Sequence, residues 1–209
     1  MNAAISGKLP DGWDEKLLQF KPSDGENGNP ESIRCGDQFC LPIAFRGHRR
    51  QRRSHTIIKY VHKIQRLFLK ETPANRNIAW VCASIKAAAA CNGLALHGGI
   101  RPYGATFSCS PDYARPGIRF RTAHLPVICD MTHDSIGLGE DGPTQPVEHL
   151  ASPAGMPNVT LIRPADANET IFAWKAALEN ANGPTQLVQC LPVRDCLFLI
   201  AANSVRLMG

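Results

Sequence analysis

One short segment of the chain collects many of the side chains that could do chemistry. Residues 132–144 contain a histidine, His133, three acids, Asp134, Glu140 and Asp141, several hydroxyl groups and three glycines. Histidine and carboxylate groups are the side chains that most often transfer protons near neutral pH. Glycine permits backbone conformations that other residues resist, so this segment can aim side chains into a cleft. The alternative is an ordinary polar loop exposed to solvent.

The elements that must position this segment alternate along the chain from residue 76 onward. The strand candidates are short, continuous apolar runs at residues 125–130, 159–162 and 185–188. One helix is expected over residues 85–97, ending at Gly98, and another begins at Asp166, with Glu169 as a capping-box partner. Such alternation predicts an α/β fold with an open, mostly parallel sheet and helices on both faces. Ligands bind beyond the carboxyl ends of such strands, so the loops after residues 130, 162 and 188 are expected to hold the site.

The net charge of +5 comes from one part of the chain. Nine basic residues and no acid lie between Arg46 and Lys70, whereas the rest of the chain is acidic overall. This run could be a nucleic-acid-binding or nuclear-targeting module over residues 46–70, or a basic amphipathic helix with a solvated face, because apolar residues recur at helical spacing over residues 57–67. No known nucleic-acid-binding module accompanies the run, so we do not expect nucleic acid as a partner.

Composition narrows the class of protein further. The eight cysteines form no Cys-x-x-Cys pair and show no zinc-ligand spacing with histidine, so no metal site is expected within the chain. No apolar run approaches the roughly 18 residues that span a bilayer, and the first residues lack the apolar centre of a secretion signal. We therefore expect a cytoplasmic protein without a membrane partner, an organellar location being the alternative.

Three long strings of mixed chemistry resemble the pyrimidine-binding domain of transketolase. They are Asn-Gly-Leu-Ala-Leu-His-Gly-Gly-Ile-Arg-Pro-Tyr-Gly-Ala-Thr-Phe at 92–107, residues 132–152, and Arg-Pro-Ala-Asp-Ala-Asn-Glu-Thr-Ile at 163–171. Residues 8–13 look like the connection that precedes that domain. The resemblance divides the chain into a linker-like segment (1–34), a diverged basic segment for which disorder is one alternative (35–75), the transketolase-like domain (76–190) and a diverged tail (191–209).

The resemblance implies an enzyme that uses thiamine diphosphate and Mg²⁺ to transfer two-carbon ketol units between sugar phosphates. In that family this domain holds the aminopyrimidine of the cofactor, and a separate amino-terminal domain binds the diphosphate and the metal. His133 matches a histidine that contacts substrate near the reacting carbon, and Asp141 matches an aspartate that recognises a substrate hydroxyl. Phe107 and Tyr113 match aromatic residues beside the pyrimidine ring. The partner is expected to be a second copy of the chain or a chain that carries the diphosphate-binding domain.

The departures from the family pattern fall on the chemistry. Ser84 stands where the family has a glutamate that hydrogen-bonds the pyrimidine, and Ser110 replaces a second ring-stacking phenylalanine. The histidine expected between Thr144 and Gln145 is missing, as is a phosphate-binding arginine near residues 187–193. No counterpart of the diphosphate-binding domain is found in the chain. We therefore expect an impaired or inactive fragment, with a non-catalytic, dimerising subunit as the alternative.

The departures share an unusual form. The codons of residues 80–86, read from the third base of the tryptophan codon, can encode the family string Gly-Val-Arg-Glu-His-Gln. The codons of residues 108–111, read one base earlier, can likewise encode the family string Leu-Val-Phe-Ser. Those of residues 153–155, read one base later, can encode the family string Leu-Arg-Ala. We therefore hypothesise that local frame slips in a transketolase gene produced the diverged segments, including the basic one.

Overall fold

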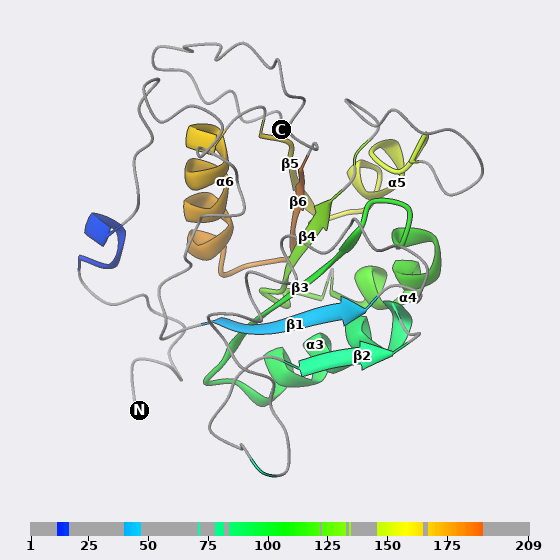
Figure 1. Cartoon of the computed structure of the whole chain (residues 1–209), viewed down its shortest axis with the longest axis horizontal. Coiled ribbons are helices and arrows are strands. Elements are labelled where there is room, and N and C mark those ends of the chain that lie inside the picture. Colours follow the sequence, from blue (N-terminus) through cyan, green and yellow to red (C-terminus); the bar gives the residue numbers. More distant parts are fainter. Residues whose placement is uncertain are drawn as a thin grey trace.

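The computed structural model describes residues 12–16, 40–46, 71, 78–81, 84–121, 123–132, 134, 146–164 and 167–189 (Figure 1). Its centre is a six-stranded sheet in the order β2-β1-β3-β4-β6-β5, and every neighbouring pair is parallel. The strands are β1 (Cys40–Arg46), β2 (Ile78–Val81), β3 (Arg101–Phe107), β4 (Ile128–Thr132), β5 (Thr160–Ile162) and β6 (Thr185–Val188). The helices are α3 (Ser84–His97), α4 (Pro111–Arg121), α5 (Ala151–Ala154) and α6 (Ala167–Glu179), with a 3-10 turn, η1 (Trp13–Lys16).

Helix α6 covers one face of the sheet (Figure 1). Trp174 and Leu178 of this helix pack on Ile128 of β4 and Leu187 of β6. Tyr103 of β3 meets Trp174 edge to face, with ring centroids 5.3 Å apart. Such an arrangement places the positive ring edge of one aromatic on the negative face of the other.

Helices α3 and α4 cover the opposite face, where two buried clusters form the core. Ala88 of α3 and Ile118 of α4 pack with Met131 of β4 and Val188 of β6. Further along α3, Cys91 packs on Val127, just before β4. Side chains that alternate along β4 therefore contribute to the two faces in turn, which explains why its sequence reads as one continuous apolar run.

The predicted α/β fold, with an open parallel sheet and helices on both faces, is confirmed. The strand expected at residues 125–130 begins later, at Ile128, because Pro126 has no N–H to donate and Val127 N–H donates to the Leu125 carbonyl instead of to a neighbouring strand. The helix expected at residues 85–97 is α3, and the following Gly98 and Gly99 have φ of 76° and 77°, as the glycine stop predicts.

The strand β1 was not expected, because residues 35–75 were interpreted as a diverged basic segment. Cys40–Arg46 instead forms a strand that lies between β2 and β3 in the sheet. The string Cys-Leu-Pro-Ile-Ala-Phe-Arg has apolar residues in succession, as strands buried on both faces do. The proposed amphipathic helix at residues 57–67 lies outside the described residues.

The opening segment also contacts the domain. Trp13 of η1 packs against the cluster under α6, and Asp14 Oδ2 accepts a hydrogen bond from Lys175 Nζ at 2.6 Å. This bond lowers the pKa of Asp14 and raises that of Lys175. Residues 13 and 14 are therefore attached to α6, although residues 1–34 were expected to be linker-like. Among the described helices, none is long and apolar enough to cross a bilayer.

Candidate active site

The strand order creates a switch point between β1 and β3. The connection that leaves β1 leads to β2 on one side of it, whereas the connection that leaves β3 leads to β4 on the other side. The two connections therefore run apart from the carboxyl ends of β1 and β3, which are neighbours in the sheet. Open α/β sheets bind ligands at such a point. Both strands continue two residues beyond the register pair Ala44 and Ala105, and β3 ends there at Phe107. The expected cofactor-binding residue Phe107 therefore lies at this edge of the sheet.

A tight connection joins Phe107 to the start of α4. The Phe107 carbonyl accepts from Ser110 N–H at 2.9 Å, and the Ser110 carbonyl accepts from Tyr113 N–H at 3.0 Å. Pro111 is the first residue of α4, a position that needs no N–H. Tyr113 is 74% exposed on the first turn of α4. The structure thus holds Phe107 and Tyr113 at the two ends of one short turn, with Tyr113 facing outward from this chain.

The start of α3 lacks the carboxyl group that the family resemblance predicts. Ser84 is the first residue of α3, and the first turn of this helix contains no acid. Asp130 of β4 is a buried acid two residues from Ile128, and it therefore faces α6 rather than α3. Asp130 consequently does not replace the missing glutamate.

The segment with His133 and Asp141 is anchored at its start. Asp134 is 1% exposed and pairs with the guanidinium of Arg163, which follows β5. Asp134 N–H also donates to the Gln189 carbonyl, after β6, at 3.3 Å. Asp134 is one of the acids expected to be able to do chemistry, but its carboxylate is buried in an ion pair with Arg163. Asp134 therefore fixes the backbone directly after His133.

His133 and Asp141 themselves lie outside the described residues, so their side chains are not placed. Thr132, directly before His133, pairs with Phe107 in the register of β3 and β4. The backbone at residue 132 is therefore beside the expected cofactor-binding residue. The sequence offered no signal for the roles of Arg163 and Gln189, since both depend on which strand ends meet.

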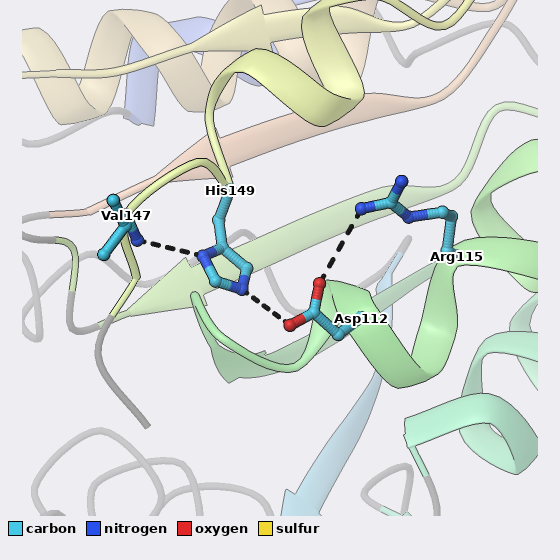
Figure 2. Close-up of polar contacts among 4 residues, drawn as sticks. All are labelled: Asp112, Arg115, Val147 and His149. Atoms are coloured by element: carbon cyan, nitrogen blue, oxygen red, sulfur yellow. Dashed lines mark hydrogen bonds and ion pairs between the residues drawn. The ribbon is translucent and has the colours of Figure 1, made fainter. Parts of the chain in front are cut away.

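A second polar cluster holds the chain just after this segment (Figure 2). His149 is 7% exposed, and its Nδ1 accepts from Val147 N–H at 3.1 Å. Its Nε2 is 2.9 Å from Oδ2 of Asp112, whose other oxygen lies 3.7 Å from Arg115. Because Nδ1 accepts, the proton of neutral His149 is on Nε2, where it is donated to Asp112.

The same cluster contains three side chains of the kinds that ligate metal ions. Ligand atoms of Asp112, Glu148 and His149 lie within 4.8 Å of one another. A metal at His149 needs a free lone pair on a ring nitrogen, but Val147 N–H occupies Nδ1 and the proton occupies Nε2. These three residues therefore do not fit a divalent metal as they stand, and the cluster joins the segment at residues 147–149 to α4.

Two serines and a cysteine follow Phe107 in the turn before α4. Ser110 Oγ accepts from the Thr106 hydroxyl at 2.8 Å. Ser108 is 3% exposed, and its hydroxyl has no hydrogen-bond partner among the described residues. Burial raises the pKa of the Cys109 thiol, which makes it a poor nucleophile. The unpartnered Ser108 hydroxyl is therefore a cost to the fold, and the Cys109 thiol is not suited to act as a nucleophile at the site.

The sequence and the structure of this chain are both similar to those of known proteins. The family model described as transketolase, pyrimidine binding domain, matches residues 50–192. Transketolase of Geobacillus stearothermophilus is 43% identical over 199 residues, which are 90% of this chain and 28% of that protein. Transketolase of Cereibacter sphaeroides is 61% identical over 103 residues, 48% of this chain and 16% of that protein. The solved structure of transketolase from Leishmania mexicana has a TM-score of 0.73 at 32% identity, over 90% of this chain and 28% of its own.

Proposed function

The chain belongs to the transketolase family through its pyrimidine-binding domain, and from this premise we propose that it forms the half of a thiamine diphosphate site that holds the aminopyrimidine. The chain spans less than a third of the length of the relatives named above. The family resemblance assigns the diphosphate and Mg²⁺ to a separate domain. When bound, thiamine diphosphate supplies the carbanion chemistry that transfers ketol units between sugar phosphates.

The place of Phe107 is the observation that carries this proposal. It ends β3 at the switch point of the sheet, where an aromatic ring can form one wall of a ligand site. Tyr113 lies one turn away and is exposed, so its ring is available to a cofactor or to a second chain. We assign these two residues to the pyrimidine, and His133 and Asp141 to the substrate.

The residue at the start of α3, compared with the glutamate of the family, supports an impaired activity. A hydroxyl at the start of α3 cannot share a proton with the pyrimidine as a carboxylic acid does, and no acid lies in the first turn of that helix. General acid–base contributions are typically about 10²–10⁴-fold, so we expect a loss of at least this size. The chain then acts mainly by orienting the ring.

A partner would complete the site, either a second copy of the chain or a chain with the diphosphate-binding domain. Tyr113 and Phe120 are 74% and 57% exposed on α4, and residues seven apart lie on the same side of a helix. Apolar side chains exposed in this way favour contact with another protein surface. A non-catalytic, dimerising subunit uses the same surface and is therefore compatible with this assignment.

Isothermal titration and a ketol-transfer assay test the impairment directly. For the 209-residue chain alone, with Mg²⁺ present, we expect affinity for thiamine diphosphate weaker than about 10 μM, because the chain would supply contacts to only one half of the cofactor. No turnover of sugar phosphates is expected. Micromolar binding together with ketol transfer by the chain alone would contradict the proposal that this fragment is impaired.

A further inference from the structure

Two side-chain donors converge on the carbonyl oxygen of Asn182, in the connection from α6 to β6. His124 Nδ1 lies 3.0 Å from this oxygen, and Asn158 Nδ2 donates to it at 3.1 Å. A carbonyl oxygen only accepts, so His124 carries its proton on Nδ1 in this contact. The two donors come from the connections that precede β4 and β5.

The residue after Asn182 is part of the same junction. A Cβ at Gly183 would lie 2.7 Å from the Asn158 carbonyl oxygen, so only glycine fits there. His124 and Asn158 have φ of 65° and 61°, so both donors stand on backbone in the left-handed region. We call His124, Asn158, Asn182 and Gly183 the loop junction. It lies at the amino ends of β4, β5 and β6.

The loop junction bears on the chemistry of one peptide group, because the Asn182 carbonyl and the Gly183 N–H belong to the same amide. When the Gly183 nitrogen loses its proton, the negative charge is shared with the carbonyl oxygen by resonance. Hydrogen bonds to a charged form favour that form, so His124 and Asn158 lower the free energy cost of this deprotonation. Oxyanion holes stabilise a developing charge in the same way. The Gly183 nitrogen is therefore a better nucleophile than an ordinary amide.

The electrophile within reach of this nitrogen is the side chain of Asn182 itself. Asn182 is exposed, and its side-chain amide takes part in none of the hydrogen bonds of the described residues. Gly183 is buried, but its N–H likewise donates to none of the described groups. With no Cβ on Gly183, the side chain of Asn182 can turn toward the nitrogen without a clash.

We propose that Asn182 is a site of spontaneous deamidation that His124 and Asn158 activate. The Gly183 nitrogen attacks Cγ of Asn182 and forms a C–N bond, while the side-chain nitrogen gains the proton that Gly183 lost and leaves as ammonia. Water then opens the succinimide ring at either carbonyl, which gives aspartate or isoaspartate. This site lies at the edge of the sheet opposite Phe107, so it does not depend on the proposed function.

The isoaspartate product alters the loop junction. When water opens the ring at the former α-carbonyl, the chain runs through Cγ and gains one methylene. The oxygen that accepted from His124 and Asn158 then belongs to a free carboxylate. Gly183 is displaced from its close fit against Asn158. We therefore expect the isoaspartate form to unfold at a lower temperature than the unmodified chain.

A second Asn-Gly pair in the same chain provides an internal control. Asn92 is 5% exposed within α3, and its Nδ2 donates to the Gly117 carbonyl at 2.9 Å. Gly93 also lies inside α3, where the helical hydrogen bonds hold its backbone. We therefore expect Asn92 to be protected while the chain is folded. A third pair, at residues 27–28, lies outside the described residues.

Peptide mapping by mass spectrometry, with separation of aspartate from isoaspartate, tests the proposal in the full chain. After incubation in weakly alkaline buffer, Asn182 should be converted to both products while Asn92 persists. Conversion should be slower in weakly acidic buffer, because the Gly183 nitrogen must lose a proton. In urea Asn92 should be converted as well, so its persistence shows that a sample stayed folded.

Two variants isolate the donors. His124→Gly and Asn158→Gly each remove one donor, and glycine suits the positive φ at both positions. Each should slow the conversion of Asn182 about three- to tenfold, the effect of losing one hydrogen bond. His97→Ala removes a histidine that is exposed at the end of α3 and should leave the rate unchanged.

Three results would overturn the proposal. They are persistence of Asn182 in the folded natural sequence, conversion of Asn92 as fast as that of Asn182 under the same conditions, and an unchanged rate in both glycine variants. Thiamine diphosphate binding is measured separately, so a failure of the proposed function leaves this result unaffected.

Discussion

Ser108 and Ser110 are buried hydroxyl groups two residues apart in the turn from β3 to α4, and they differ in hydrogen bonding. Ser110 receives a bond from Thr106, whereas Ser108 has no partner among the described residues. Removing an unsatisfied buried hydroxyl recovers its desolvation cost, so Ser108→Ala should stabilise the fold by about 1 kcal/mol. Ser110→Ala loses a bond and should destabilise it by about 1 kcal/mol. Urea unfolding measures both, and equal destabilisation by the two variants would contradict this account.

The unsatisfied Ser108 also bears on the hypothesis of local frame slips. The family string at residues 108–111 begins with leucine, which would fill this buried position without a polar atom. Buried polar atoms without partners are uncommon in natural cores. A frame slip at residues 108–111 would be expected to leave such an atom in the core. The hypothesis itself concerns the gene and stays a prediction.

At the scale of elements, α3 and α4 approach closely at Gly117. A Cβ at this position would lie 2.7 Å from Cβ of Ala88, and Gly117 also accepts a hydrogen bond from Asn92 at 2.9 Å. Gly117→Ala forces the helices apart and should destabilise the fold by about 1–3 kcal/mol. Gly93, within α3, has nothing within 4 Å of its Cβ position, so Gly93→Ala should stabilise by about 0.5–1 kcal/mol. Thermal unfolding compares the two, and a stable Gly117→Ala would contradict the close packing.

Which elements could be predicted from sequence depended on whether their pattern is local. The strands β4, β5 and β6 and the helices α3 and α6 were predicted, because apolar runs and helix ends are visible in the chain itself. The strand β1 was missed, because its basic surroundings concealed a short apolar run that is stabilised only by its neighbours β2 and β3. Gln189 and Arg163 were missed for the same reason, since their roles depend on strand order.

At the scale of the whole molecule, most of the positive charge comes from a part of the chain outside the described sheet and helices. The described sheet and helices come mostly from the part of the chain that is acidic overall, and most of the basic run lies outside the described residues. Net charge is therefore a poor guide to function here, and family membership is the better one. The roles of His133 and Asp141 remain predictions from the resemblance.

The central claim is that this chain recognises the aminopyrimidine and not the diphosphate. NMR titration of the labelled chain with thiamine, thiamine diphosphate or inorganic diphosphate, each with Mg²⁺, distinguishes recognition of the aminopyrimidine from recognition of the diphosphate. We predict that thiamine and its diphosphate shift the amide signals of Phe107 and Tyr113 at about 1 mM ligand, a binding energy of roughly −4 kcal/mol.

Inorganic diphosphate should leave these signals unchanged. Tyr113→Ala should lose the response to thiamine, whereas Phe172→Ala, which truncates a 55% exposed ring on α6, should keep it. Shifts at Phe107 and Tyr113 with thiamine, absent with diphosphate alone, are the result that the account predicts. No response to thiamine at these residues, or an equal response to inorganic diphosphate, would contradict it.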